Sequence, residues 1–196
     1  MFKAIDIIQA EHRRLAAMLH CLASVLQDVK KGMLEPDFEL FEAVLHYVES
    51  FLYHFHHPKE DSYLFCTLRE RVPELDKVLD QLEEEHQHGA RLVERLRTTL
   101  EAYKRHGGPG LPAFLAAAED YYQFEYKHMA MEEREVLPLA RKRLTEEDRA
   151  RLDAVFMAHE DPLFGDKPKK EFETLYTAIL NRAPAPHGLG LRADRH

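Results

Sequence analysis

Two short stretches decide the fold of this chain: residues 55–61 read Phe-His-His-Pro-Lys-Glu-Asp, and residues 128–133 read His-Met-Ala-Met-Glu-Glu. Each stretch holds a His-x-x-x-Glu pair, and these pairs are His56 with Glu60 and His128 with Glu132. Four residues at about 100° per step place the two side chains of a pair about 40° apart on one helix face. An imidazole and a carboxylate so placed can share one metal ion, and the second carboxylate oxygen can reach a neighbouring ion. We therefore expect both stretches to be helical and to carry metal ligands.

A lone histidine precedes each pair. His12 lies 44 residues before His56, and His86 lies 42 residues before His128, so the chain repeats one unit. From His12 to Gly32 a helix rises about 30 Å, and a return helix of similar length brings His56 back to the same level. We expect the four histidines and the two glutamates to meet in one layer of the core.

Apolar residues recur at helical spacing in four long segments that are separated by glycine and proline. We expect helices over about 2–31, 36–71, 73–105 and 112–144, with a loop rich in glycine and proline at 107–112. Strand signals are absent from the sequence. Four long helices joined by short connections predict an all-α fold, an up-down-up-down antiparallel four-helix bundle.

Shorter helical segments follow the bundle. Residues 145–148, Thr-Glu-Glu-Asp, form a variant capping box that predicts a fifth helix as far as Met157, and a last helix is expected at about 169–180. We therefore expect three regions: a bundle over 1–144, a helical appendage packed on it over 145–182, and a disordered tail over 183–196.

Composition excludes several classes of function. The chain has 196 residues and a formal net charge of −8, which argues against nucleic-acid binding and against docking on an anionic membrane. No segment approaches the roughly 20 apolar residues of a membrane span, and the N-terminal residues lack the features of a signal peptide. Cys21 and Cys66 form no recognisable ligand pair, and we expect both to be reduced in a cytoplasmic protein.

Histidines and carboxylates that face the core need a hydrogen-bond partner or a metal ion. Glu132 continues the stripe of Tyr121, His128 and Leu139, and an unpaired carboxylate there would cost several kcal/mol. A metal ion removes that cost, and a ligand set of imidazoles and carboxylates without thiolates suits iron or manganese, with zinc as a substitute. Because two carboxylates can be shared, we expect two metal ions and six ligands: His12, His56, Glu60, His86, His128 and Glu132.

Other assignments stay open at this point. His57 with Asp61 offers a second register for the pair on the second helix, although only His56 with Glu60 matches the pair on the fourth. His54 and His88 are expected to be exposed or to lie behind the ligands. The set Glu83-x-x-His86 and Glu125-x-x-His128 matches ferritin-like di-iron bundles. That fold needs a further glutamate from each remaining helix; Glu60 is available, but Glu11, beside His12, is a poor candidate. Glu125 is expected to accept a hydrogen bond behind the ligands.

Three further features receive a structural interpretation. Pro58 and Pro138 interrupt the helical patterns close to the histidine pairs, and each predicts a local kink. The tyrosines near the site are expected to pack rather than to bind metal, and these are Tyr53, Tyr63, Tyr121, Tyr122 and Tyr126. His159 is expected to help dock the C-terminal segment on the bundle.

The sequence resembles the haemerythrin HHE cation-binding family over residues 2–144. The family pattern is a histidine, then His-x-x-x-Glu, then one or two histidines, then a histidine with an acid four or five residues later, and the six proposed ligands fill it. The stretches 55–61 and 131–138 are similar to those of bacterial members. The resemblance implies a helical bundle that binds iron and a small ligand such as dioxygen, peroxide or nitric oxide.

The chain also departs from the oxygen-carrying members of that family. Ala90 stands where their second histidine on the third helix would fall, and Glu132 follows His128 by four residues rather than five. We expect one ion to lose a nitrogen ligand, and a more open site to favour sensing, scavenging or modest peroxidase-like chemistry over reversible oxygen storage. A metal storage or sensing module without turnover is the main alternative, and a helical interaction protein with incidental histidines is another.

Overall fold

The computed structural model describes residues 2–157 and 168–190, and within these ranges it contains helices and no strand. The all-helical prediction is confirmed. The first long helix, α1, spans Lys3–Lys30, and α5 spans Asp76–His106. Both end before a glycine with positive φ, Gly32 at 69° and Gly107 at 62°, a conformation that residues with a Cβ rarely adopt.

The second and fourth predicted helices are divided into shorter elements. Between α1 and α5 lie α2 (Phe38–Val48), the π-helix η1 (Glu49–His56), α3 (His57–Lys59), the π-helix η2 (Glu60–Phe65), α4 (Cys66–Arg71) and the 3₁₀ turn η3 (Pro73–Leu75). After α5 come the 3₁₀ turn η4 (Gly108–Gly110), α6 (Leu111–Met131), the π-helix η5 (Glu132–Val136) and α7 (Leu137–Arg143). The bundle therefore contains more helical elements than the four uninterrupted helices that the sequence predicts.

The interruptions fall where prolines were expected to disturb the helix. η1 ends two residues before Pro58, and η5 ends two residues before Pro138. Proline cannot donate to the carbonyl four residues earlier, and a π-helical turn, whose hydrogen bonds span five residues, is one way to rearrange the bonding there. These wide turns occur at both His-x-x-x-Glu stretches.

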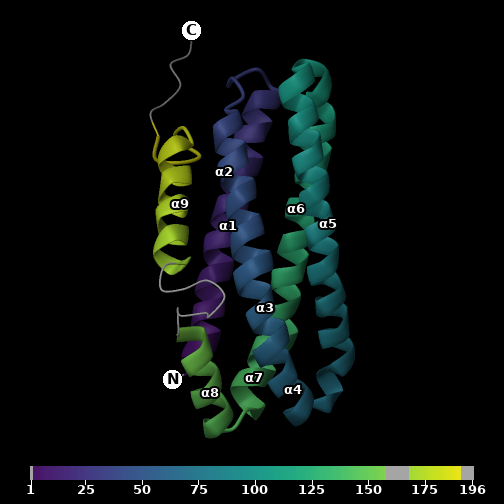
Figure 1. Ribbon diagram of the computed structural model, residues 1–196, viewed down its shortest axis with the longest axis vertical. Coiled ribbons are helices and arrows are strands. Elements are labelled where there is room, and N and C mark those ends of the chain that lie inside the picture. The colour runs from purple at the N-terminus through teal and green to yellow at the C-terminus, as the bar shows by residue number, and fades with distance from the viewer. Residues whose placement is uncertain (1, 158–167, 191–196) are drawn as a thin grey trace.

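Two short helices cover one side of the bundle. α8 (Glu146–Met157) lies against α1 near the N-terminus, and α9 (Pro168–Arg182) lies beside α1 and α2 (Figure 1). The predicted capping box at the start of α8 is confirmed, because Asp148 and Thr145 each accept a hydrogen bond from the backbone N–H of the other. Residues 183–190 turn back on α9, and His187 pairs with Asp28 on α1 at 2.7 Å. His159 lies outside the described residues.

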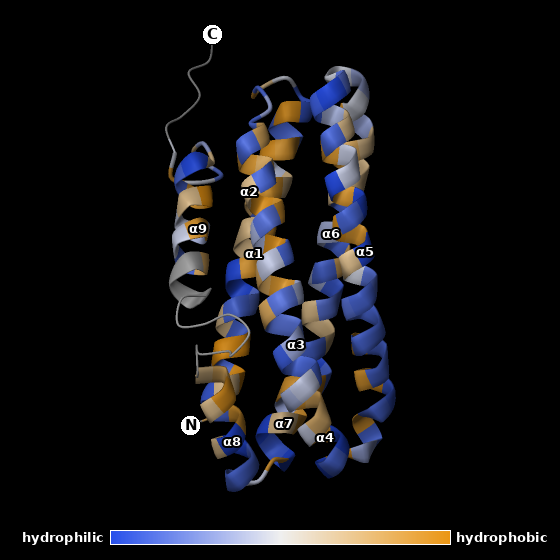
Figure 2. Cartoon of the chain, in the orientation of Figure 1, coloured by the Kyte–Doolittle hydropathy of each residue, from blue (hydrophilic) through white to orange (hydrophobic). Residues whose placement is uncertain are grey.

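The bundle has two apolar cores with a polar layer between them. One core extends from Leu15 and Phe55 towards the loops after α1 and α5, and the other gathers Ile8, Leu64 and Val136 near the N-terminus. Hydrophobic and hydrophilic residues alternate along the helices (Figure 2), as expected for helices with one apolar and one polar face. None of the described helices is both long enough and apolar enough to cross a membrane. The polar layer between the two cores holds the candidate site.

Candidate metal centre

Seven polar side chains are buried together in this layer. Each is at most 5% exposed, and they come from all four sides of the bundle: His12, His56, His57, Glu60, His86, His128 and Glu132. Six of them are the residues that the sequence predicted, and the structure brings all six together. The seventh, His57, was weighed only as an alternative to His56.

The imidazoles form two groups. His57, His86 and His128 offer ring nitrogens that all lie within 4.8 Å of one another, and His12 and His56 form a second group with Glu60 under the same limit. The Nε2 atoms of His86 and His128 face each other at 3.1 Å. Two lone pairs at this distance repel each other unless a proton or a cation lies between them, so the arrangement favours a bound cation or a charged imidazole.

The two glutamates lie between the histidine groups. Glu60 is 3.3 Å from Nε2 of His56 and 3.8 Å from Nε2 of His86. Glu132 is 3.1 Å from Nε2 of His12 and 3.5 Å from Nε2 of His128. Each carboxylate therefore faces both groups, as a ligand shared by two ions would.

The fit of a metal pair can be tested on the carboxylate oxygens. Both oxygens of Glu60 and both oxygens of Glu132 are buried, and within the described ranges none has a hydrogen-bond partner of good geometry. A buried carboxylate without donors costs several kcal/mol and is rare in proteins. Ring nitrogens surround these oxygens at distances that leave space for cations, so the residues present fit a pair of metal ions.

A second set of carboxylates holds the outer side of the histidine rings. Nδ1 of His56 lies 2.8 Å from Glu11, and Nδ1 of His128 lies 2.9 Å from Glu85. Because a carboxylate only accepts, each Nδ1 donates, and Nε2 is directed into the layer. The same arrangement joins His86 to Asp61 at 2.7 Å and His12 to Glu133 at 3.2 Å. Metal-binding histidines are commonly oriented in this way.

These carboxylates form a ring around the bundle. Glu11 on α1 supports His56 on η1, Asp61 on η2 supports His86 on α5, Glu85 on α5 supports His128 on α6, and Glu133 on η5 supports His12 on α1. Each side of the bundle thus orients a histidine on the next side. His57 is the exception: its Nδ1 is buried and has no hydrogen-bond partner within the described ranges.

The charges in the layer are strongly coupled. Burial alone lowers the pKa of His12, but the carboxylates of Glu132 and Glu133 outweigh it and raise that pKa to about 9. Burial likewise lowers the pKa of His86, and Asp61 together with Glu132 raises it to about 9. Without metal, both histidines therefore carry protons in the position that a metal would take.

The other groups shift in different directions. Burial and the neighbouring Glu132 raise the pKa of Glu60 well above its usual value. Burial also acts to raise the pKa of Glu132, but His128 and His12 outweigh it and hold that pKa well below its usual value. Burial and the nearby imidazoles lower the pKa of His57 well below its usual value, which keeps this ring neutral and its nitrogens available as ligands.

Sequence reasoning missed His57 because it treated adjacent histidines as competing registers. In the structure the rings of His56 and His57 both point inward, with centroids 5.5 Å apart, and each joins a different histidine group. The inward stripe of a helix is at least about 100° wide, so two adjacent residues can occupy its two edges. In the sequence, Pro58 indicated that the helix is disturbed next to these two histidines.

The structure bears on one alternative and on one expectation about the ligand set. Asp61 does not replace Glu60, because its carboxylate accepts from Nδ1 of His86 on the outer side. Ala90 is exposed, so a histidine there would not reach the layer. The group expected to lack an imidazole has three, and His57 is the additional one.

The remaining nearby residues lie behind or outside the layer. His54 and His88 are exposed, and Glu83 pairs with Arg69 near the surface, so the ferritin-like ligand set does not assemble. Glu125 is fully buried and accepts a hydrogen bond from the Tyr53 hydroxyl at 3.0 Å. The expected role of Glu125 as an acceptor is thus found, with a tyrosine and not a ligand histidine as its donor.

Comparisons with known proteins agree with this geometry. The family model described as Hemerythrin HHE cation binding domain matches residues 3–140, which is more than half of the chain. Searches of curated proteins and of solved structures gave no match. The matched range contains every residue of the polar layer and of the carboxylate ring.

Proposed function

The chain belongs to the hemerythrin HHE cation-binding family, and from this premise we propose that it holds two iron ions in the polar layer. The proposed ligands are the six residues predicted from the sequence, with His57 as a seventh. We further propose that the helical runs form one up-down-up-down bundle over residues 1–144. The region 145–182 is then a helical appendage packed on the bundle.

One observation carries the proposal: four buried carboxylate oxygens, none with a hydrogen bond of good geometry within the described ranges, stand between two groups of inward-facing imidazoles. Imidazole and carboxylate together suit iron, and manganese or zinc can replace it. Five imidazole nitrogens and four carboxylate oxygens would hold the two ions. We propose dioxygen, peroxide or nitric oxide as the small ligand of the loaded centre.

The residues of the chain would contribute position and exclusion of water. The ring of Glu11, Asp61, Glu85 and Glu133 holds four histidines in fixed orientations. The two apolar cores close the layer above and below. Bound iron would supply the redox chemistry, for sensing, scavenging or modest peroxidase-like turnover in the cytoplasm.

The test is metal content together with the visible spectrum. Protein produced with added iron should contain about two irons per chain, and Glu132→Gln should lose most of this iron because a shared carboxylate becomes an amide. Glu135→Gln is the matched control, since Glu135 lies on the same π-helix but pairs with Arg134 at the surface. Less than about 0.2 metal ions per wild-type chain would overturn the proposal and leave a helical interaction protein.

Reactivity towards peroxide, dioxygen and nitric oxide separates the three remaining functions. Iron-loaded protein that consumes peroxide faster than free iron would be a scavenger or peroxidase. Iron-loaded protein whose spectrum changes with dioxygen, peroxide or nitric oxide without turnover would be a sensor. Stable iron that none of these molecules affects would indicate storage.

A further inference from the structure

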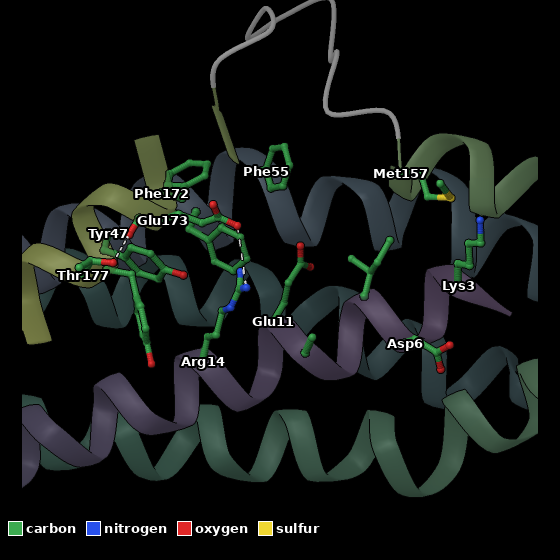
Figure 3. Close-up of a pocket in the computed structure, with 14 residues that line it drawn as sticks. Lys3, Asp6, Glu11, Arg14, Tyr47, Phe55, Met157, Phe172, Glu173 and Thr177 are labelled. Carbon is green, nitrogen blue, oxygen red and sulfur yellow. Dashed lines mark hydrogen bonds and ion pairs between the residues drawn. The ribbon is translucent and has the colours of Figure 1, made fainter. Parts of the chain in front are cut away.

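A second site lies outside the polar layer. A cavity of about 680 Å³ opens between α1, the α2–η1 run and α9 (Figure 3). Its walls carry five aromatic rings: Tyr47, Phe51, Phe55, Phe172 and Tyr176. Cavities of this size with aromatic walls and a few polar groups are typical of sites for small molecules. We call it the aromatic cavity.

Phe172 builds the wall that α9 contributes. Its ring lies edge-on to Phe51 at 5.3 Å and to Tyr47 at 6.0 Å, and it is tilted against Phe55 at 5.6 Å. Ring edges around a cavity can meet the face of a flat aromatic guest, a perpendicular contact that aromatic rings favour. The shape of the walls therefore favours a planar aromatic molecule over an extended aliphatic one.

The polar groups of the cavity include both donors and acceptors. Arg14 and Glu173 face each other at 3.9 Å, and both side chains are about half exposed, 47% and 48%. A pair this long and this exposed contributes little and can be exchanged for contacts with a guest. Glu11 also lines the cavity (Figure 3). Because donors and acceptors stand together, a neutral guest whose hydroxyl group both donates and accepts matches them better than a cation or an anion does.

The aromatic cavity reaches the proposed metal centre. Glu11, on its wall, accepts the hydrogen bond from Nδ1 of His56 at 2.8 Å. Phe51, on the same wall, stacks on the His56 ring with centroids 5.6 Å apart and planes at 30°. A guest in the cavity is thus separated from one proposed metal ligand by a single side chain.

From these contacts we propose that the aromatic cavity binds a small neutral quinol that reduces the metal centre. A quinol that becomes a quinone breaks two O–H bonds, releases two protons to water and gives up two electrons, the number that converts two ferric ions to two ferrous ions. The direction of electron transfer rests on the proposed function. Binding of the guest does not depend on that function, because none of the proposed metal ligands lines the cavity. Glu11 and Phe51 line it and contact one of those ligands, His56.

The first experiment measures binding to metal-free protein by calorimetry at neutral pH. Naphthol is the probe, and naphthoate and naphthylmethylammonium are its charged counterparts. Naphthol should bind at least about threefold more tightly than either, and Phe172→Leu should weaken it about tenfold. Phe38→Leu is the matched control, because Phe38 is also a partly buried ring but packs on Tyr103 away from the cavity.

A second variant reports on the site directly. The chain has no tryptophan, so Phe172→Trp creates a single emitting indole in the cavity wall, and naphthol should quench or shift its emission with the affinity found by calorimetry. No heat and no emission change at millimolar naphthol would overturn the proposal. Equal binding of the charged counterparts, or equal weakening by Phe172→Leu and Phe38→Leu, would also overturn it.

The last experiment distinguishes binding of a quinol in the aromatic cavity from the proposed metal-binding function. Naphthohydroquinone should bleach the ferric absorption of iron-loaded wild type under argon, and about tenfold more slowly in Phe172→Leu than in Phe38→Leu. If naphthol binds as expected but the protein takes up no iron, the metal proposal fails and the aromatic site stands. If iron loads and the reduction rates of the two variants are equal, the reductant role is wrong.

Discussion

Loading the centre with metal should release protons, and their number follows from the geometry of the layer. His12 and His86 each have a pKa of about 9 without metal, because Glu132 with Glu133 and Glu132 with Asp61 outweigh the effect of burial. At pH 7.5 both rings are almost fully protonated, and a metal binds only the neutral ring. Two protons must therefore leave, and Glu60, whose pKa is raised well above its usual value, adds up to one more.

The expected magnitudes can be stated for both affinity and stability. Affinity for the metal pair should rise about 100-fold per pH unit between pH 6.5 and 9, a factor of ten for each histidine proton. The stability of the metal-free protein should move the other way. The raised pKa values of His12 and His86 contribute about 3 kcal/mol each, fully present below pH 6.5 and lost as the pH rises through about 9. Metal should therefore stabilise the protein most at alkaline pH.

The assay is calorimetry with zinc, which has no redox chemistry, in buffers of different ionisation enthalpy. Wild type should release between about two and three protons at pH 7.5. Asp61→Asn removes the carboxylate behind His86 and should lower the count by about one. Asp120→Asn, at a surface pair with Arg95, should leave it unchanged. Release of fewer than about one proton by wild type, or an unchanged count in Asp61→Asn, would refute the reasoning.

Two further substitutions test the ligand set and the packing behind it. His57→Ala should weaken binding of one of the two ions by about 10- to 100-fold, measured as metal per chain after dialysis. His54→Ala, at an exposed position, should leave the metal content unchanged. Equal retention of metal by both variants would remove His57 from the site. Gly89→Ala would place a Cβ 2.5 Å from the Tyr53 hydroxyl, and it should lower the free energy of unfolding by about 1–3 kcal/mol in denaturant titrations. Gly108→Ala, where a Cβ would meet nothing within 4 Å, should change it by less than about 0.5 kcal/mol, and a similar loss in both variants would contradict the packing argument.

Much of the helical framework could be predicted because local chemistry determines it. The first helix was expected over 2–31 and is observed over Lys3–Lys30, with Gly32 in the left-handed conformation that follows a helix end. The capping box at Thr145 was found from four residues alone. Six side chains of the polar layer were also found: four belong to the two pairs spaced four residues apart, and the other two, His12 and His86, followed from the repeat within the chain.

The sequence could not show how the helices are interrupted. The α-helical period assigns one face to His56 with Glu60 and another to His57 with Asp61, so only one pair was expected to point inward. The π-helical turns η1 and η2 flank these residues and depart from that period. The sequence indicates such turns only through the nearby proline, because the position of a π-helical turn depends on packing across the bundle.

The carboxylate ring suggests why the two halves of the chain repeat as they do. The repeat includes more than the ligands: Glu11 precedes His12 as Glu85 precedes His86, and an acid follows both Glu60 and Glu132. In the structure, each acid next to one ligand supports a histidine on the neighbouring side of the bundle rather than its own neighbour in sequence. A bundle in which every side supplies both a ligand and a support closes only when all four sides are in register. The buried acids and histidines therefore determine the register of the helices as well as the position of the metal. Apolar side chains specify this register less strictly, because they can repack when one helix shifts along another.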